Sequence, residues 1–219
     1  MSDALRTPAQ ATQAVAALPP RSTALDIEVA RAEVYGLLAQ LLYASPQPDL
    51  LAQLRVAVTE APAAGAFLEE SWQQWVGVAR GMDDNAVRAE YSALFEGVGR
   101  PEIYLFGSYY LSGFLNEKPL ARLRTDLAKL GLARTDAMGD TEDHVAYLCE
   151  VMRYLIAGDD MAVCNLTQQQ RFFSQHLQPW LPALCDTVAQ HPGARFYAAL
   201  AVFTAAFMQV EAQGFDMLE

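Results

Sequence analysis

Apolar residues recur at steps of three and four along most of the chain, which is the spacing of one face of an α-helix. The first such stretch covers residues 27–42, and Pro46 and Pro48 separate it from the next. No stretch alternates apolar and polar residues with the period of two that is typical of a β-strand. The pattern predicts an all-α, single-domain bundle of about nine to eleven helices. We expect them at residues 27–42, 49–60, 64–80, 84–96, 105–115, 119–130 and 142–157, with two or three more within 159–190 and 193–213.

Local signals refine several of these elements. The aromatic content of residues 105–115 leaves both a helix and a strand open. Gly131 is expected as the C′ residue of the helix that begins at Pro119. Asp140 or Thr141 is expected to cap the helix at 142–157, which places Asp143 in its first turn, where the helix dipole favours a carboxylate. Residues 1–22 are polar and Ala-rich, and we expect a flexible tail there, followed by a helical domain over 23–219.

Charge and composition exclude several classes of function. The 219 residues include 15 Lys and Arg and 26 Asp and Glu, for a net charge of −11, which disfavours binding to nucleic acid or to an anionic membrane. The longest uncharged apolar stretch, residues 196–210, is shorter than the roughly 20 residues that cross a bilayer, so no stable membrane insertion is expected. Three widely spaced cysteines and the lack of an export signal favour reduced thiols in the cytoplasm.

Candidate catalytic and metal-binding residues are scarce. The chain has three histidines, His144, His176 and His191, and none lies three or four residues from another. The sequence contains no HExxH pair, no GxSxG, no P-loop and no GxGxxG. We therefore expect a protein that is not an enzyme and that has no metal site and no cofactor.

Residues 91–114 are unusually rich in aromatic side chains. They hold seven of the chain's 22 Phe, Trp and Tyr residues, nearly three times an even share. Glu90, Glu96 and Glu102 lie in or beside this segment, with Arg100 as its one basic residue. Aromatic rings supply contact area at low entropic cost, and carboxylates beside them suit a cationic, apolar peptide.

Core packing is the competing explanation for these rings. It is favoured for Tyr91 and Phe95, which share a helix face with Leu94. The adjacent Tyr109 and Tyr110 cannot both face inward from one helix, so at least one of them is expected near a surface or groove.

Two further features have a structural and a functional interpretation. Glu90 lies at the edge of an apolar helix face, where it either bonds a loop backbone or lines a wet groove. Asp143 is explained by helix capping alone. His144 is explained less well, because the positive end of a helix disfavours imidazolium.

Several short motifs follow one another in a defined order along the chain. They are EYSALF at 90–95, a Gly/Pro loop, SYY at 108–110, EDH at 142–144 before a helix, QRFFSQHLQPW at 170–180 and RFYAAL at 195–200. This ordered set resembles the TorD/DmsD family of cytoplasmic redox-enzyme maturation chaperones, over roughly residues 27–210. Glu142 stands where family members commonly have a proline, and residues 104–108 replace a proline-containing element. These departures indicate a divergent subgroup.

The resemblance implies an all-helical fold of the TorD type. It also implies binding of the twin-arginine signal peptide and the immature catalytic subunit of a molybdopterin oxidoreductase, which is held until its cofactor is inserted. The client is expected to be a formate dehydrogenase or a related reductase. Carried over by position, the peptide-binding residues would be Tyr35, Glu90, Tyr91, Leu94, Phe95, Ser108, Tyr109, Asp143 and His144.

Two other functions stay open on the sequence alone. A chaperone of the NarJ type would act on a nitrate reductase subunit that is not exported, and its client would lack a complete twin-arginine motif. A small enzyme or nucleotide-binding protein is the other alternative, although nothing in the sequence resembles a phosphate cradle. The chain itself is compatible with a monomer or a dimer.

Overall fold

The computed structural model describes residues 23–57, 66–97 and 99–217, so the tail predicted at residues 1–22 lies outside the described residues. Within these ranges the chain forms ten α-helices and one π-helix, which confirms the all-α prediction. The elements are α1 (Thr23–Tyr43), α2 (Pro48–Val56), α3 (Ala66–Arg80), α4 (Asp84–Tyr91), η2 (Ser92–Glu96), α5 (Gly107–Ser112), α6 (Lys118–Lys129), α7 (Val145–Ala157), α8 (Leu166–His176), α9 (Leu181–Ala189) and α10 (Phe196–Asp216).

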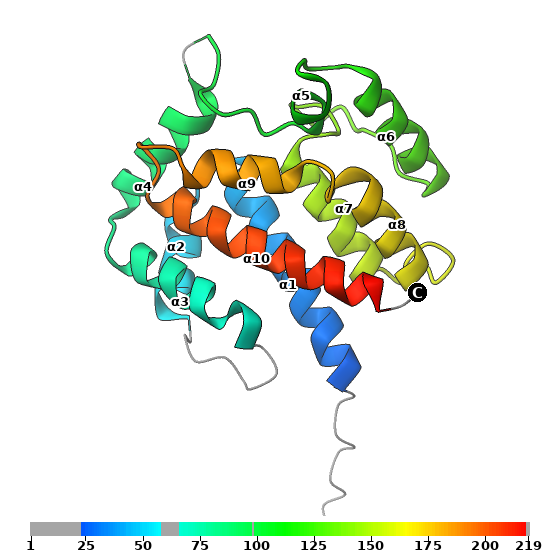
Figure 1. Ribbon diagram of the computed structural model, residues 1–219, viewed down its shortest axis with the longest axis horizontal. Coiled ribbons are helices and arrows are strands. Elements are labelled where there is room, and N and C mark those ends of the chain that lie inside the picture. Colours follow the sequence, from blue (N-terminus) through cyan, green and yellow to red (C-terminus); the bar gives the residue numbers. More distant parts are fainter. Residues whose placement is uncertain (1–22, 58–65, 98, 218–219) are drawn as a thin grey trace, which may run out of the picture.

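The long helices α1, α7 and α10 form the centre of the bundle. Helix α1 packs along α7, and α10 packs against both α9 and α3. Figure 1 shows α2, α3 and α4 at one end of the molecule, and α5 and α6 at the other. The largest fully buried side chains include Trp75, Trp180 and Phe203, and the buried apolar residues form one core.

By its length and composition alone, helix α10 is long and apolar enough to cross a membrane. The apolar stretch seen in the sequence is shorter because it stops at residue 210, whereas the helix continues through the charged Glu211 to Asp216. Half of its most apolar window is buried inside the protein. Phe196, Phe203 and Phe207 lie in the core, so α10 has the packing of a core helix.

The helix predicted at residues 84–96 changes geometry near its end. Helix α4 ends at Tyr91, and the chain continues as the π-helix η2, in which the Gly97 N–H donates to the carbonyl of Ser92. The Leu94 carbonyl accepts instead from the Ile103 N–H, at 2.9 Å. Gly97 has φ +42°, and a Cβ there would collide with the carbonyl of Arg100, so glycine permits this turn.

The predicted end of α6 is confirmed. Gly131 has φ +73°, and its N–H donates to the Ala128 carbonyl, while the Leu132 N–H donates to the carbonyl of Leu127. These two bonds form a Schellman motif with Gly131 at C′.

Candidate peptide-binding site

The loops before α5 and α7 lie side by side and form the centre of the candidate site. Phe106 and His144 make a single antiparallel bridge, and the Gly107 N–H donates to the Asp143 carbonyl at 2.9 Å. This pairing resolves the ambiguity at 105–115, because residue 106 is extended and the helix is limited to 107–112. It also brings together three of the predicted site residues, Ser108, Asp143 and His144.

Asp143 holds the start of α5 and not the first turn of α7. Its carboxylate accepts from the Ser108 N–H at 2.8 Å and from the Thr141 hydroxyl at 2.6 Å. The expectation that it lies inside the helix at 142–157 was wrong, because α7 begins only at residue 145. The neighbouring Glu142 pairs with Arg124 through two bonds of 2.9 Å, which ties this loop to α6.

His144 is the N-cap of α7, a role that the sequence analysis gave to Asp140 or Thr141. Its Nδ1 accepts from the Ala146 N–H at 3.2 Å, so the neutral ring carries its proton on Nε2. Burial lowers the pKa of His144 to about 4, although the charges of Asp140 and Asp143 act in the opposite direction. A neutral imidazole also avoids the repulsion between a cation and the positive end of the helix.

This arrangement predicts a pH-dependent stability. Between pH 6.5 and about 4 the unfolded chain binds a proton at His144 that the folded chain excludes, so acidification favours unfolding. We expect the free energy of unfolding to fall by up to about 3 kcal/mol from this group over that range. In urea titrations from pH 7 to pH 4, the His144→Asn variant, which keeps a capping side chain, is expected to lose less stability than the wild type. Equal losses in the two proteins would contradict the assignment.

The side chain of Trp180 packs against α5. A Cβ at Gly107 would lie 3.0 Å from the Trp180 ring, so the backbone of α5 can approach this closely because residue 107 is glycine. Tyr110 stacks on the same ring with centroids 5.6 Å apart, and the indole N–H donates to the His176 carbonyl at 2.6 Å. The motif at 170–180 therefore has a positioning role beneath the candidate site.

Glu90 bonds backbone, which is the structural alternative considered for it. Its two carboxylate oxygens accept from the N–H groups of Arg195, Phe196 and Tyr197 at 2.8, 3.0 and 2.8 Å. These groups lie at the N-terminus of α10, where a helix leaves N–H groups unpaired and favours negative charge. Glu90 thus caps a helix that begins more than 100 residues later in the chain.

Four other predicted site residues are buried. Tyr91, Leu94 and Phe95 belong to the core, where the rings of Tyr91 and Phe95 contact that of Tyr197. This placement confirms the core interpretation of Tyr91 and Phe95. Tyr35 is fully buried and donates its hydroxyl to Glu211 at 3.0 Å.

Tyr109 differs from these residues because it is 37% exposed. Its ring lies 4.4 Å from that of Tyr104, centroid to centroid, whereas Tyr110 is half-buried against Trp180. The prediction that at least one of the adjacent tyrosines lies near the surface is confirmed.

Four residues that the sequence analysis did not assign to the site surround His144 and Tyr91. We call this group, Tyr43, Glu96, Asp140 and Tyr147, the acid–aromatic surface. The Tyr43 ring lies 5.6 Å from that of Tyr147 and 6.3 Å from that of His144, centroid to centroid, and its side chain is 45% exposed.

The two carboxylates of this surface, Glu96 and Asp140, both act on the hydroxyl of Tyr91. Burial raises the pKa of Tyr91, and the charges of Glu96 and Asp140 raise it further. Among the residues that the structure describes, neither carboxylate forms an ion pair. The surface thus offers two carboxylates without an ion-pair partner beside the exposed ring of Tyr43 and the half-buried ring of Tyr147.

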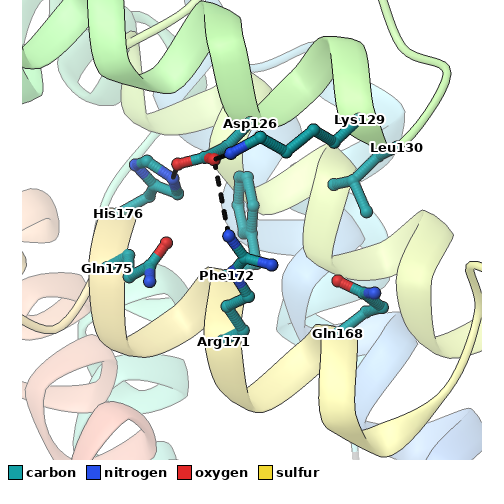
Figure 2. A pocket seen from close by; sticks show the side chains of 8 residues that line it. All are labelled: Asp126, Lys129, Leu130, Gln168, Arg171, Phe172, Gln175 and His176. Carbon is teal, nitrogen blue, oxygen red and sulfur yellow. Dashed lines mark hydrogen bonds and ion pairs between the residues drawn. The ribbon is translucent and has the colours of Figure 1, made fainter.

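A second cluster lies in a pocket of about 50 Å³ between α6 and α8 (Figure 2). Asp126 on α6 is at its centre, 3.1 Å from His176 Nε2, 2.6 Å from Lys129 Nζ and 3.8 Å from Arg171. These contacts balance the negative charge of Asp126, and those from Arg171 and His176 join α8 to α6. Across the described ranges, no group of three or more His, Cys, Asp or Glu side chains is placed to hold a metal ion.

This fold and this arrangement of motifs belong to one protein family. The sequence profile of the nitrate reductase delta subunit family matches residues 61–186, and the chain is a member of that TorD/NarJ family. The resemblance noted from the motifs is thereby confirmed.

Relatives in two species are similar over different lengths. The chaperone protein TorD of Vibrio cholerae serotype O1 is 27% identical over 204 residues, which cover 86% of this chain and 93% of that protein. The chaperone protein TorD of Photobacterium profundum is 24% identical over 132 residues, 57% of this chain and 61% of that protein.

Proposed function

We propose that the protein is a cytoplasmic chaperone that binds the twin-arginine signal peptide and the immature catalytic subunit of a molybdopterin oxidoreductase. Family membership supports the chaperone class. The acid–aromatic surface is the observation that carries the peptide-binding role, because it matches a segment with paired arginines followed by apolar residues. In this proposal the exposed Tyr109 forms the edge of the binding site, and Ser108, Asp143 and His144, whose side chains are buried, hold the loops beneath it.

Tyr35, Glu90, Tyr91, Leu94 and Phe95 contribute indirectly in this proposal. Their side chains are buried and bond or pack within the protein, so they hold the helices that carry the surface. A substitution at one of them weakens peptide binding through a change in fold or stability.

The acid–aromatic surface is suited to arginine for two reasons. A guanidinium group stacks on aromatic faces and pairs with carboxylates through directed hydrogen bonds. Unneutralised carboxylates also attract a cationic peptide over several ångströms, which raises the association rate and makes binding sensitive to salt.

The test is a calorimetric titration with a synthetic twin-arginine signal peptide. We expect the double variant Glu96→Lys/Asp140→Lys to bind the peptide about tenfold more weakly or worse, and Tyr43→Ala to lose a similar factor. Both variants should keep the helical circular dichroism of the wild type, because the substituted side chains are exposed or half-buried. The matched control, Glu70→Lys/Asp186→Lys, changes the net charge equally at exposed positions on α3 and α9 and should bind normally. Equal weakening in the control would show that binding depends on net charge alone and would contradict a peptide-binding role for the acid–aromatic surface.

The family description favours one alternative client. A nitrate reductase subunit that is not exported would place the protein with chaperones of the NarJ type. The N-terminal sequence of the bound client distinguishes the two, because this client would lack the complete twin-arginine motif. Formate dehydrogenase or a related reductase remains our proposal for an exported client.

A further inference from the structure

Positive charge is concentrated in one segment of this acidic chain. Residues 118–134 hold five of the 15 Lys and Arg residues and only one of the 26 Asp and Glu residues. The segment therefore has a net charge of +4, while the remainder of the chain has −15. The net charge of −11 is an average that conceals this separation, so it does not describe what α6 presents to a partner.

Part of this positive charge is unpaired. Arg124 pairs with Glu142 and Lys129 pairs with Asp126, the contact drawn in Figure 2. Lys118 and Arg122 are exposed, and neither side chain has a hydrogen bond or ion pair with any described residue. They are four residues apart in α6 and so lie on the same helix face, which is distinct from the face buried through Leu120, Leu123 and Leu127.

Exposed apolar side chains precede these two basic residues in the chain. Leu111, Phe114 and Leu115 are 43%, 70% and 39% exposed. They lie in the last turn of α5 and in the connection to α6, which runs along the outer edge of the molecule in Figure 1. We call these three residues, together with Lys118 and Arg122, the α5–α6 elbow.

We propose that the α5–α6 elbow docks the protein reversibly on an anionic lipid bilayer. Its two unpaired basic side chains outnumber the one exposed carboxylate beside them, Glu117, so residues 111–122 have a net charge of +1. This charge is complementary to anionic headgroups, which attract basic residues near the surface. Phe114 and Leu115 would enter the boundary between headgroups and acyl chains, where exposed apolar side chains leave water. The strongly acidic remainder of the protein is repelled by the same surface, so one orientation is favoured.

The shape and strength of this contact fit peripheral binding. The Phe114 side chain is mostly exposed to solvent, so it suits a deformable layer better than a peptide that requires a groove. A few basic and apolar side chains give a weak, reversible attachment. The proposal does not involve α10, which is packed in the core.

The test is co-sedimentation of the full chain with vesicles. We expect the wild type to sediment with vesicles of phosphatidylglycerol and phosphatidylethanolamine, and several-fold less with vesicles of phosphatidylcholine alone. Raising the ionic strength from about 0.05 to about 0.5 M should release most of the bound protein, because screening weakens the contact. Lys118→Glu/Arg122→Glu should reduce the partition coefficient by about tenfold or more, and Phe114→Ser should reduce it several-fold at unchanged net charge.

Two matched controls complete the design. Arg88→Glu/Arg100→Glu reverses two exposed basic residues outside the elbow and so changes the net charge as much as the elbow double variant does. Met161→Ser removes an exposed apolar residue from the turn before α8. Both controls should bind the anionic vesicles as the wild type does. Circular dichroism and urea unfolding check that each variant is folded. The proposal is overturned if the wild type binds neither vesicle, if it binds both equally, or if the folded elbow variants bind as tightly as the controls.

Discussion

Replacing Glu90 with alanine is expected to destabilise the protein by about 3–5 kcal/mol, since three N–H groups at the start of α10 lose a charged acceptor. The Phe196 and Tyr197 N–H groups are buried and cannot be rehydrated cheaply. Because α10 contributes Phe196, Phe203 and Phe207 to the core, fraying at its N-terminus weakens the packing of the whole bundle. Urea unfolding followed by circular dichroism measures this loss.

Two variants separate this cap from a general loss of negative charge. Glu90→Gln keeps one oxygen that can accept from these N–H groups, so we expect about half the loss. Glu70→Ala removes an exposed carboxylate from α3 and should change the stability by less than about 0.5 kcal/mol. If Glu90→Ala unfolds at the same urea concentration as the wild type, the Glu90 carboxylate does not stabilise the start of α10.

Replacing Glu211 with alanine is expected to cost a comparable amount, about 3–5 kcal/mol, because it leaves a largely buried arginine with the partly exposed Glu28 as its one carboxylate partner among the described residues. Arg31 donates to the Glu211 carboxylate through two bonds of 2.7 and 2.8 Å, and Tyr35 donates to it at 3.0 Å. Burial and the charge of Glu211 raise the pKa of Tyr35 well above its usual value, so the tyrosine stays a neutral donor. Thermal or urea unfolding measures the effect.

The same network offers its own controls. Glu28 also pairs with Arg31, at 2.8 Å, but it is partly exposed, and Glu28→Ala should cost less than about 1 kcal/mol. Tyr35→Phe removes one donor and should cost about 1 kcal/mol. Comparable losses for Glu28→Ala and Glu211→Ala would show that the buried carboxylate has no special role in holding α1 to α10.

The spacing of apolar residues predicted the helices well, because the apolar face of a helix is set by residues close together in the sequence and then packs into the core. The stripe at 27–42 corresponds to α1, and the glycine expected at the end of α6 has its predicted conformation. The start of α7 was misplaced because several residues before Val145 can cap a helix, and the bridge between Phe106 and His144 decides among them. That bridge joins segments almost 40 residues apart in the chain, and the periodicity of apolar residues carries no information on such long-range contacts.

The candidate site was predicted less completely for the same reason. Glu90 was recognised as a carboxylate that needs a partner, but its partners lie more than 100 residues away. Tyr43 was overlooked because it ends a helix stripe and meets Tyr147 only in the folded protein. Motif resemblance located the region, and the chain's own contacts then separated the buried supports from the exposed surface.

Affinity purification of the tagged protein from a lysate of its native cells, with mass spectrometry of the retained proteins, tests the central claim most directly. We expect a molybdoenzyme catalytic subunit that still carries its twin-arginine signal peptide, and we expect less of it with Glu96→Lys/Asp140→Lys than with Glu70→Lys/Asp186→Lys. A nitrate reductase subunit without an export signal would instead identify the NarJ-type function. Recovery of no oxidoreductase with the folded wild type would contradict the proposed chaperone function.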